Sequence, residues 1–335
     1  MKPLNCLIVF ILMTLFFSCG EMIVTPAGSN RNVEDFKAVW SRINEVYPYL
    51  DFKDINWDSI YTVYRPRAEQ AKGDEFYLVL WDLLAELKDG HVYYRTPGGG
   101  EVYPYVPARH LKDRHAYSPF VVRSYFDKAL RLSKSGTLEY ELLPGNIGYV
   151  FISTFHEDFL ADEFPDVLLY LKNSKGLIID IRQKIGGDYR NIEAVVTRFL
   201  TEPLERNDAY SDGVKWVMPP FEPQGPFQYT HPVVVLINGS TFSAGEFTTE
   251  ILKQLPQVTA VGDTTGGGSA GGGDSSLYRL PSGKWIQIDF IDFRRYDGLP
   301  WEWLGVAPDI RVEQTAADVS AGRDKQLEYA IELLK

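Results

Sequence analysis

The chain is organised around one stretch, Val233-Val-Val-Leu-Ile-Asn-Gly-Ser-Thr-Phe-Ser-Ala-Gly-Glu246. Its five apolar residues, Val233 to Ile237, predict a short buried strand, because most are β-branched and turn-forming residues follow them. From Ser243 onward the apolar residues recur at helical spacing. A serine at such a junction can be a plain helix N-cap or a nucleophile, since the free N–H groups of a helix start favour developing negative charge.

The composition is that of an ordinary globular protein. The chain has 335 residues, of which 45% are hydrophobic and 24% charged, enough for one large domain or two smaller ones. The formal net charge is −11, so a basic nucleic-acid surface is not expected, and we predict no nucleic-acid partner.

The N-terminus has the pattern of an export signal. Lys2 precedes an apolar run from Cys6 to Phe17, which is short for a membrane span, and the run ends at Ser18-Cys19. This ending resembles a bacterial lipobox, although the usual leucine three residues before the cysteine is Phe16 here. We expect residues 1–19 to be a lipoprotein signal peptide, with a lipid on Cys19 as membrane anchor in the cell envelope, on the periplasmic or outer-membrane side. The alternative is an ordinary signal peptide with a chance cysteine.

The remainder divides into four segments. Residues 20–32 lack periodicity and predict a tether, and residues 33–95 predict a small helical subdomain whose second helix ends before Pro66. Residues 96–137 are broken by glycine and proline and predict a connecting segment, in which Phe120-Val-Val122 could form a strand. In residues 138–335 strand and helix patterns alternate, which predicts an α/β core with a largely parallel sheet.

Four places in the chain carry residues suited to nucleophilic catalysis. Such catalysis needs a nucleophile, a base, a group that orients the base and N–H donors for the oxyanion. Ser243, His91 and Glu302 can fill the first three roles. The backbone N–H groups of Ala244 and of Gly186 or Gly187 can form the oxyanion hole. Each feature alone has a plainer explanation, because a single histidine is usually structural and a glycine pair can simply form a tight turn.

Together these places resemble one known family. Asp89-Gly-His91, Asp180-x-Arg-x-x-x-Gly-Gly187, Ser243-Ala-x-Glu246, Val261-Gly-Asp-Thr-Thr-Gly266 and Gly305-Val-x-Pro-Asp309 occur in the order seen in the C-terminal processing (tail-specific) serine peptidases. The resemblance implies a core of ββα units, as in Clp protease and crotonase. It also implies hydrolysis of a peptide or protein substrate through an acyl-enzyme, with no cofactor.

The resemblance also implies which catalytic arrangement is used. One branch of the family has a Ser-Lys dyad, but the lysine position of that branch is Gly268 here. The tricorn-core branch uses a histidine and a glutamate, which implies Ser243 as nucleophile, His91 as base and Glu302 as orienting residue. Lys184 is a departure, since the family usually has asparagine in the loop before the glycine pair.

Other interpretations stay open at this point. A catalytically impaired binding protein on the same scaffold is the main alternative. An acyl-CoA enzyme is a poorer one, because we expect the chain to be exported to a place where acyl-CoA is not expected. The glycine run 266–273 predicts an active-site loop or a linker. Asp89 and Asp309 are expected to brace turns, whereas Asp289 and Asp292 are expected to be solvated. We predict no metal site, because the other histidines follow no ligand spacing: His110, His115, His156 and His231.

Overall fold

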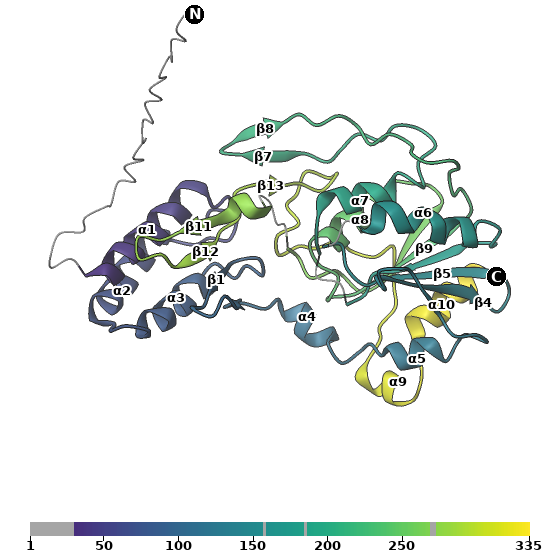
Figure 1. The fold of residues 1–335 in the computed structure, drawn as a ribbon, viewed down its shortest axis with the longest axis horizontal. Coiled ribbons are helices and arrows are strands. Elements are labelled where there is room, and N and C mark those ends of the chain that lie inside the picture. Colours follow the sequence, from purple (N-terminus) through teal and green to yellow (C-terminus); the bar gives the residue numbers. More distant parts are fainter. Residues whose placement is uncertain (1–29, 157–158, 184–185, 269–272) are drawn as a thin grey trace, which may run out of the picture.

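The computed structural model describes residues 30–156, 159–183, 186–268 and 273–335, and Figure 1 shows their arrangement. Cys19, the predicted signal peptide, most of the predicted tether and Lys184 lie outside the described residues. The α/β prediction is confirmed: a helical unit with a small antiparallel sheet lies beside a larger layered unit built on a seven-stranded sheet. No helix in the described part of the chain is both long and apolar enough to cross a bilayer.

The N-terminal unit is helical, as predicted. Helices α1 (Arg31–Val46), α2 (Trp57–Gln70) and α3 (Glu75–Ala85) bury a shared apolar core. The side chains of Asn30 and Asn56 cap the first two helices by accepting a backbone N–H bond each. The prediction that the second helix ends before Pro66 is wrong, because α2 continues to Gln70 and buries Ala68. Burial of the last turn therefore outweighs the hydrogen bond that proline cannot donate.

A small sheet completes this unit with residues from far along the chain. Its order is β11 (Leu277–Arg279), β12 (Trp285–Gln287), β1 (Tyr93–Arg95), β2 (Glu101–Val102), with β12 antiparallel to β1. Ile286 and Ile288 enter the core of the helical unit. The hairpin thus packs with the N-terminal unit, although its sequence lies within the segment predicted as core.

The large sheet has the order β14-β10-β9-β6-β5-β4-β3. Five of its strands run parallel: β5 (Ile147–Ile152), β6 (Leu177–Asp180), β9 (Val233–Ile237), β10 (Val258–Gly262) and β14 (Ile310–Arg311). Two more strands extend the sheet: β4 (Leu138–Leu143) runs antiparallel to β5, and β3 (Arg131–Leu132) runs antiparallel to β4. All five residues of β9 are buried, which confirms the predicted buried strand.

Helices cover both faces of this sheet, as Figure 1 shows. One face packs against α6 (Phe159–Leu171), α7 (Tyr189–Val196) and α8 (Ala244–Leu252). The opposite face packs against α5 (Pro119–Arg123) and α10 (Lys325–Leu333). Smaller elements are α4 (Ala108–Asp113), α9 (Ala316–Ser320), a 3₁₀ turn (Gly273–Ser276) and a sheet of β7 (Ala209–Ser211), β8 (Val214–Trp216) and β13 (Asp292–Phe293).

The possible strand at Phe120-Val-Val122 is wrong, because these residues lie in α5. Ser118 caps this helix by accepting a bond from the N–H of Val121 at 3.4 Å, and Pro119 occupies the first turn. The two helix-start signals outweigh the β preference of two adjacent valines.

Candidate active site

Ser243 lies where the loop after β9 enters α8, as the sequence predicts. Its backbone has φ +53° and ψ −120°, a conformation that residues with a Cβ rarely adopt. Strained backbone of this kind persists only when the surroundings hold it, and it is common at functional sites. The loop is held internally, since the N–H of Thr241 donates to the carbonyl of Asn238 at 2.8 Å and the Thr241 hydroxyl donates to the carbonyl of Ile181.

Glu246 fastens this loop to the glycine run. One carboxylate oxygen accepts the N–H of Ser243 at 3.0 Å and the N–H of Gly268 at 2.8 Å. The other accepts the N–H of Gly267 at 2.8 Å and the hydroxyl of Thr265. Burial raises the pKa of Glu246 to about 7, against the opposing effect of these hydrogen bonds. Residues 266–268 of the run therefore form a loop that is anchored beside the serine, and not a linker.

The glycine pair packs directly on Ser243. A side chain at Gly186 would place its Cβ 2.6 Å from the Cβ of Ser243 and 2.8 Å from its Oγ, closer than van der Waals contact allows. Gly187, with φ +147°, approaches Phe155 so closely that a Cβ there would lie 2.0 Å from a backbone carbon. Only glycine fits at both positions. The structure thus places Gly186 against the serine side chain and also near the backbone nitrogen of Ala244, from which a Cβ at Gly186 would lie 3.3 Å.

His91 approaches the serine loop through an aromatic contact. Its ring stacks on Phe242, the residue before Ser243, with ring centroids 4.4 Å apart and an interplanar angle of 24°. Asp89 braces the turn that carries the histidine, since its Oδ1 accepts the backbone N–H of His91 at 2.8 Å. Neither ring nitrogen of His91 finds a hydrogen-bond partner among the described residues.

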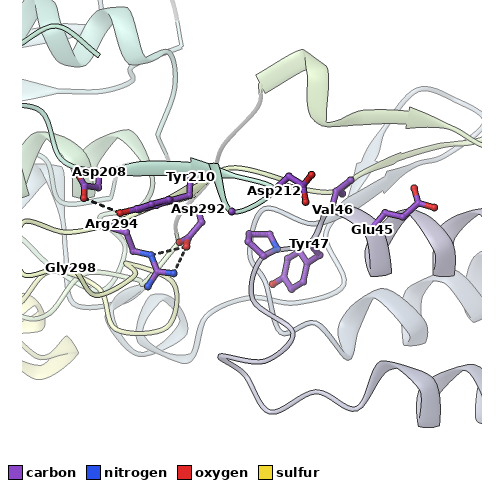
Figure 2. A pocket seen from close by; sticks show the side chains of 11 residues that line it. Glu45, Val46, Tyr47, Asp208, Tyr210, Asp212, Asp292, Arg294 and Gly298 are labelled. Atoms are coloured by element: carbon purple, nitrogen blue, oxygen red, sulfur yellow. Dashed lines mark hydrogen bonds and ion pairs between the residues drawn. The ribbon is translucent and has the colours of Figure 1, made fainter. Parts of the chain in front are cut away.

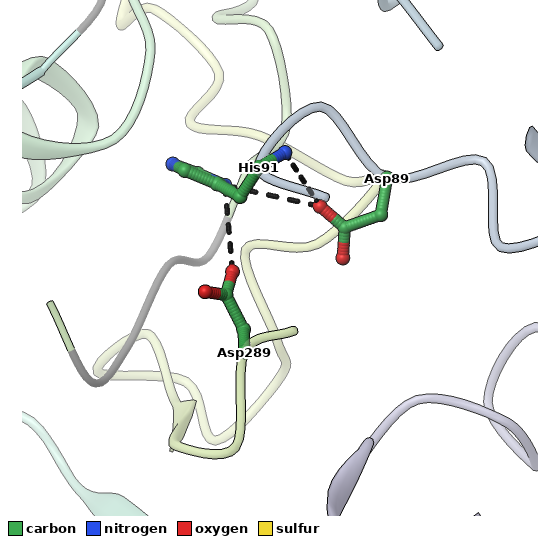
Figure 3. Close-up of side chains that lie close together, drawn as sticks. All are labelled: Asp89, His91 and Asp289. Atoms are coloured by element: carbon green, nitrogen blue, oxygen red, sulfur yellow. Dashed lines mark hydrogen bonds and ion pairs between the residues drawn. The ribbon is translucent and has the colours of Figure 1, made fainter. Parts of the chain in front are cut away.

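Two carboxylates face the Nδ1 edge of the His91 ring, as Figure 3 shows. Asp89 Oδ1 lies 3.9 Å from Nδ1 and Asp289 Oδ2 lies 3.8 Å from it. Burial lowers the pKa of His91 to about 4, an effect that the charge of Asp89 partly opposes. The imidazole is therefore neutral at pH 7 and can accept a proton.

Glu302 is buried beside a lysine that the sequence did not single out. Its Oε1 accepts a hydrogen bond from Lys53 Nζ at 2.7 Å. Lys53 also lies 3.8 Å from Asp89 Oδ2 and donates to the hydroxyl of Tyr47, which in turn donates to Asp89. Lys53 and Asp89 thus link Glu302 to the turn that holds His91.

The expectation that Asp289 and Asp292 are solvated is wrong. Their exposed fractions are 1% and 6%. Burial raises the pKa of the Asp289 carboxyl well above its usual range, and the nearby acids Asp89 and Glu302 act in the same direction. Asp292 forms an ion pair with Arg294. Asp289 follows β12 in a stretch without regular structure, and Asp292 begins the two-residue strand β13.

A cleft of about 540 Å³ lies between the end of α1 and the β7–β8 hairpin (Figure 2). Its walls include Glu45, Tyr47, Tyr210 and the Asp292–Arg294 pair. Ser243, His91 and Glu302 do not line it. Tyr47 connects the cleft with the group around His91, since it lines the cleft and its hydroxyl donates a hydrogen bond to Asp89.

Two family profiles match the chain. The profile of peptidase family S41 matches residues 146–312, and the profile of the tricorn protease C1 domain matches residues 31–85. The chain belongs to the C-terminal processing serine peptidases of family S41. The resemblance inferred from its motifs is therefore confirmed.

Individual proteins agree with this assignment. The chain is 30% identical over 196 residues to tricorn protease homolog 1 of Streptomyces coelicolor. The aligned residues cover 58% of this chain and 17% of that protein. It is 29% identical over 188 residues to the carboxy-terminal processing protease CtpA of Bacillus subtilis, and the aligned residues cover 53% of this chain and 37% of CtpA. The chain thus spans well under half the length of these relatives. A crystal structure from Parabacteroides merdae superposes with a TM-score of 0.77 at 26% identity, covering 91% of this chain and 96% of that chain.

This member of family S41 gathers most of its motif residues around one loop. Gly186 packs on Ser243 there, and His91 stacks on Phe242. Glu302 is connected to this group through its ion pair with Lys53. Sequence reasoning missed the roles of Lys53, Phe242 and Asp289. It also missed the clamp by Glu246, although a serine followed three residues later by glutamate is the signature of a capping box.

Proposed function

We propose that this S41 peptidase cleaves peptide bonds through an acyl-enzyme on Ser243, with His91 as general base. The observation that carries the proposal is the strained Ser243 at the start of α8, with Gly186 against its hydroxyl and His91 stacked on the preceding residue. A neutral buried imidazole beside a strained serine has the parts that acyl transfer needs.

The reaction runs in two halves. His91 takes the proton of the Ser243 hydroxyl as Oγ attacks the scissile carbonyl, and the N–H groups of Ala244 and of Gly186 or Gly187 receive the negative charge on its oxygen. The C–N bond then breaks, and His91 returns the proton to the leaving amine. Water attacks the ester with His91 again as base, which releases the carboxylic acid and restores Ser243.

Glu302 acts as a positioning residue in this scheme. Its carboxylate holds Lys53 at 2.7 Å, and Lys53 holds Asp89, whose Oδ1 fixes the backbone of His91. Glu302→Gln keeps the shape of the side chain and removes its charge. We expect it to lower the rate of acylation and to leave measurable activity.

We also propose that the peptidase is exported and held to a membrane by a lipid on Cys19. The support is the sequence of residues 1–19, in which an apolar run ends at Ser18-Cys19. Cys19→Ser should release the protein from the membrane fraction of its native host. Unchanged membrane retention with unchanged mass would show that this anchor does not exist.

Labelling with a fluorophosphonate, read by intact mass and peptide mapping, tests the catalytic proposal. We expect one adduct on Ser243, and loss of the adduct in Ser243→Ala and in His91→Ala. Ser240→Ala is the matched control, because Ser240 lies in the same loop and its hydroxyl has no hydrogen-bond partner among the described residues. An unlabelled wild type would favour the binding-protein alternative. Loss of labelling in Lys184→Ala, together with full labelling of His91→Ala, would make lysine the base.

A further inference from the structure

The cluster around His91 contains buried polar atoms without a partner, of which the proposed reaction uses only Nε2 of the histidine. Asp289 Oδ2 and both ring nitrogens of His91 have no hydrogen-bond partner among the described residues. The Asp289 side chain is 1% exposed, and Figure 3 shows its carboxylate pointing at Nδ1 of the ring. Leaving a buried polar atom without a partner destabilises the folded state, so these atoms call for an explanation.

The spacing of these atoms suits a shared cation better than a hydrogen bond. One ligand atom from each of Asp89, His91 and Asp289 lies within 4.8 Å of the other two. The two distances to Nδ1, 3.8 and 3.9 Å, exceed hydrogen-bonding range. Around tetrahedral zinc, with bonds of about 2.0–2.2 Å, neighbouring ligand atoms stand roughly 3.3–3.5 Å apart. The two carboxylate oxygens would each have to move about half an ångström toward Nδ1 to reach that spacing from the imidazole.

The charges of the cluster also favour a bound cation. Asp89, Asp289 and Glu302 are three buried acids, and Lys53 is the cation that contacts two of them. Lys53 Nζ is bonded to Glu302 at 2.7 Å and lies on the Oδ2 side of Asp89, whereas Oδ1 of Asp89 faces His91. The lysine therefore does not fill the space between Asp89, His91 and Asp289. One imidazole and two carboxylates are a ligand set that zinc accepts.

We propose that Asp89, His91 and Asp289 form a regulatory site for one zinc ion, which silences the peptidase when it binds. The binding part stands on the geometry alone, and the silencing part rests on the proposed role of His91. A metal on Nδ1 of a neutral imidazole leaves the ring proton on Nε2. Nε2 then has no lone pair for the Ser243 proton, so the base is lost while the nucleophile stays in place.

Calorimetry of the full chain tests the binding part. Zinc chloride is titrated into Ser243→Ala, which cannot turn over, and we expect one ion per chain. Adding Asp289→Asn should weaken zinc binding by more than about tenfold. Loss of a residue that only orients a ligand typically lowers metal affinity by at least that factor, and loss of a direct ligand should lower it at least as much. Adding His115→Ala is the control, since this exposed histidine lies outside the cluster. Equal affinity with and without Asp289→Asn would overturn the site.

Fluorophosphonate labelling of the wild type tests the silencing part. We expect full labelling in a chelator, loss of labelling with one equivalent of zinc, and recovery when chelator is added back. Labelling that is unaffected by bound zinc would overturn the regulatory role. An enzyme that is unlabelled even in chelator would instead refute the catalytic proposal, and the calorimetry would still decide whether zinc binds.

Discussion

Lys53→Met should destabilise the protein more than any loss of a surface ion pair. The Lys53 ammonium and the Glu302 carboxylate are 0% and 1% exposed and lie 2.7 Å apart. At an effective dielectric constant of about 20, charges at that distance attract by about 6 kcal/mol. Part of this attraction offsets the cost of taking both ions out of water, so breaking such a pair typically costs about 3–5 kcal/mol. The expected loss is a large share of the stability of a typical domain, about 5–15 kcal/mol.

Guanidinium unfolding followed by tryptophan fluorescence measures this loss as a shift of the midpoint. Lys335→Met is the matched control, because its ion pair with Glu332 is 62% and 72% exposed and should contribute less than about 1 kcal/mol. The double variant Lys53→Met/Glu302→Gln removes both charges and should recover part of the loss. A single variant as stable as the control, or a double variant no more stable than the single one, would refute the reasoning.

Three further predictions concern the serine loop. Gly186→Ala should abolish fluorophosphonate labelling, because its Cβ would lie 2.8 Å from the Ser243 Oγ, whereas Gly213→Ala, also at positive φ but in open space, should keep it; equal labelling of both would contradict the packing. Phe242→Ala removes the ring that stacks on His91 and should slow labelling by about tenfold or more, with unchanged rates counting against His91 as base. Burial raises the pKa of Glu246 from 4.5 to about 7, so its contribution to stability is complete below about pH 4.5 and is lost as the pH rises through 7. The stability of the wild type relative to Glu246→Gln should therefore fall by up to about 1.4 kcal/mol per pH unit between about pH 5 and 7, and a flat difference would show that the pKa is not raised.

Local patterns were sufficient to predict the central elements of the fold. β9 and α8 follow from one apolar run, one turn and one helical stripe, all within about twenty neighbouring residues. The pairing of β12 with β1 could not be predicted in this way, because Gln287 and Tyr93 are far apart in the chain and the strands have three residues each. Strands that short contain too few residues to show alternation, and their partners are chosen by tertiary packing.

Prediction of the site had a similar limit. Motifs located Ser243 and the glycine pair, since a strand end followed by glycine and a helix start is a local signal. Asp289 was expected to be solvated, because it lies on or near a predicted strand and carboxylates are seldom buried without a partner. Its burial follows from the docking of the hairpin on the N-terminal helices, which no short motif determines.

Lys53 shows that a residue role inferred from a family pattern has to be checked against the charged groups around that residue. The pattern assigns Glu302 to His91, but in the structure Glu302 bonds to Lys53 at 2.7 Å, while Asp89 and Asp289 face Nδ1. A glutamate held by a cation is a weaker acceptor for an imidazolium than a free one, because the lysine competes for the same charge. In the proposed reaction, stabilisation of the protonated His91 therefore falls to the aspartates that face Nδ1, and Glu302 acts on Asp89 only through Lys53. The effect of Glu302→Gln on acylation should consequently be smaller than that of Asp89→Asn, and the reverse order would restore Glu302 as the direct partner of His91.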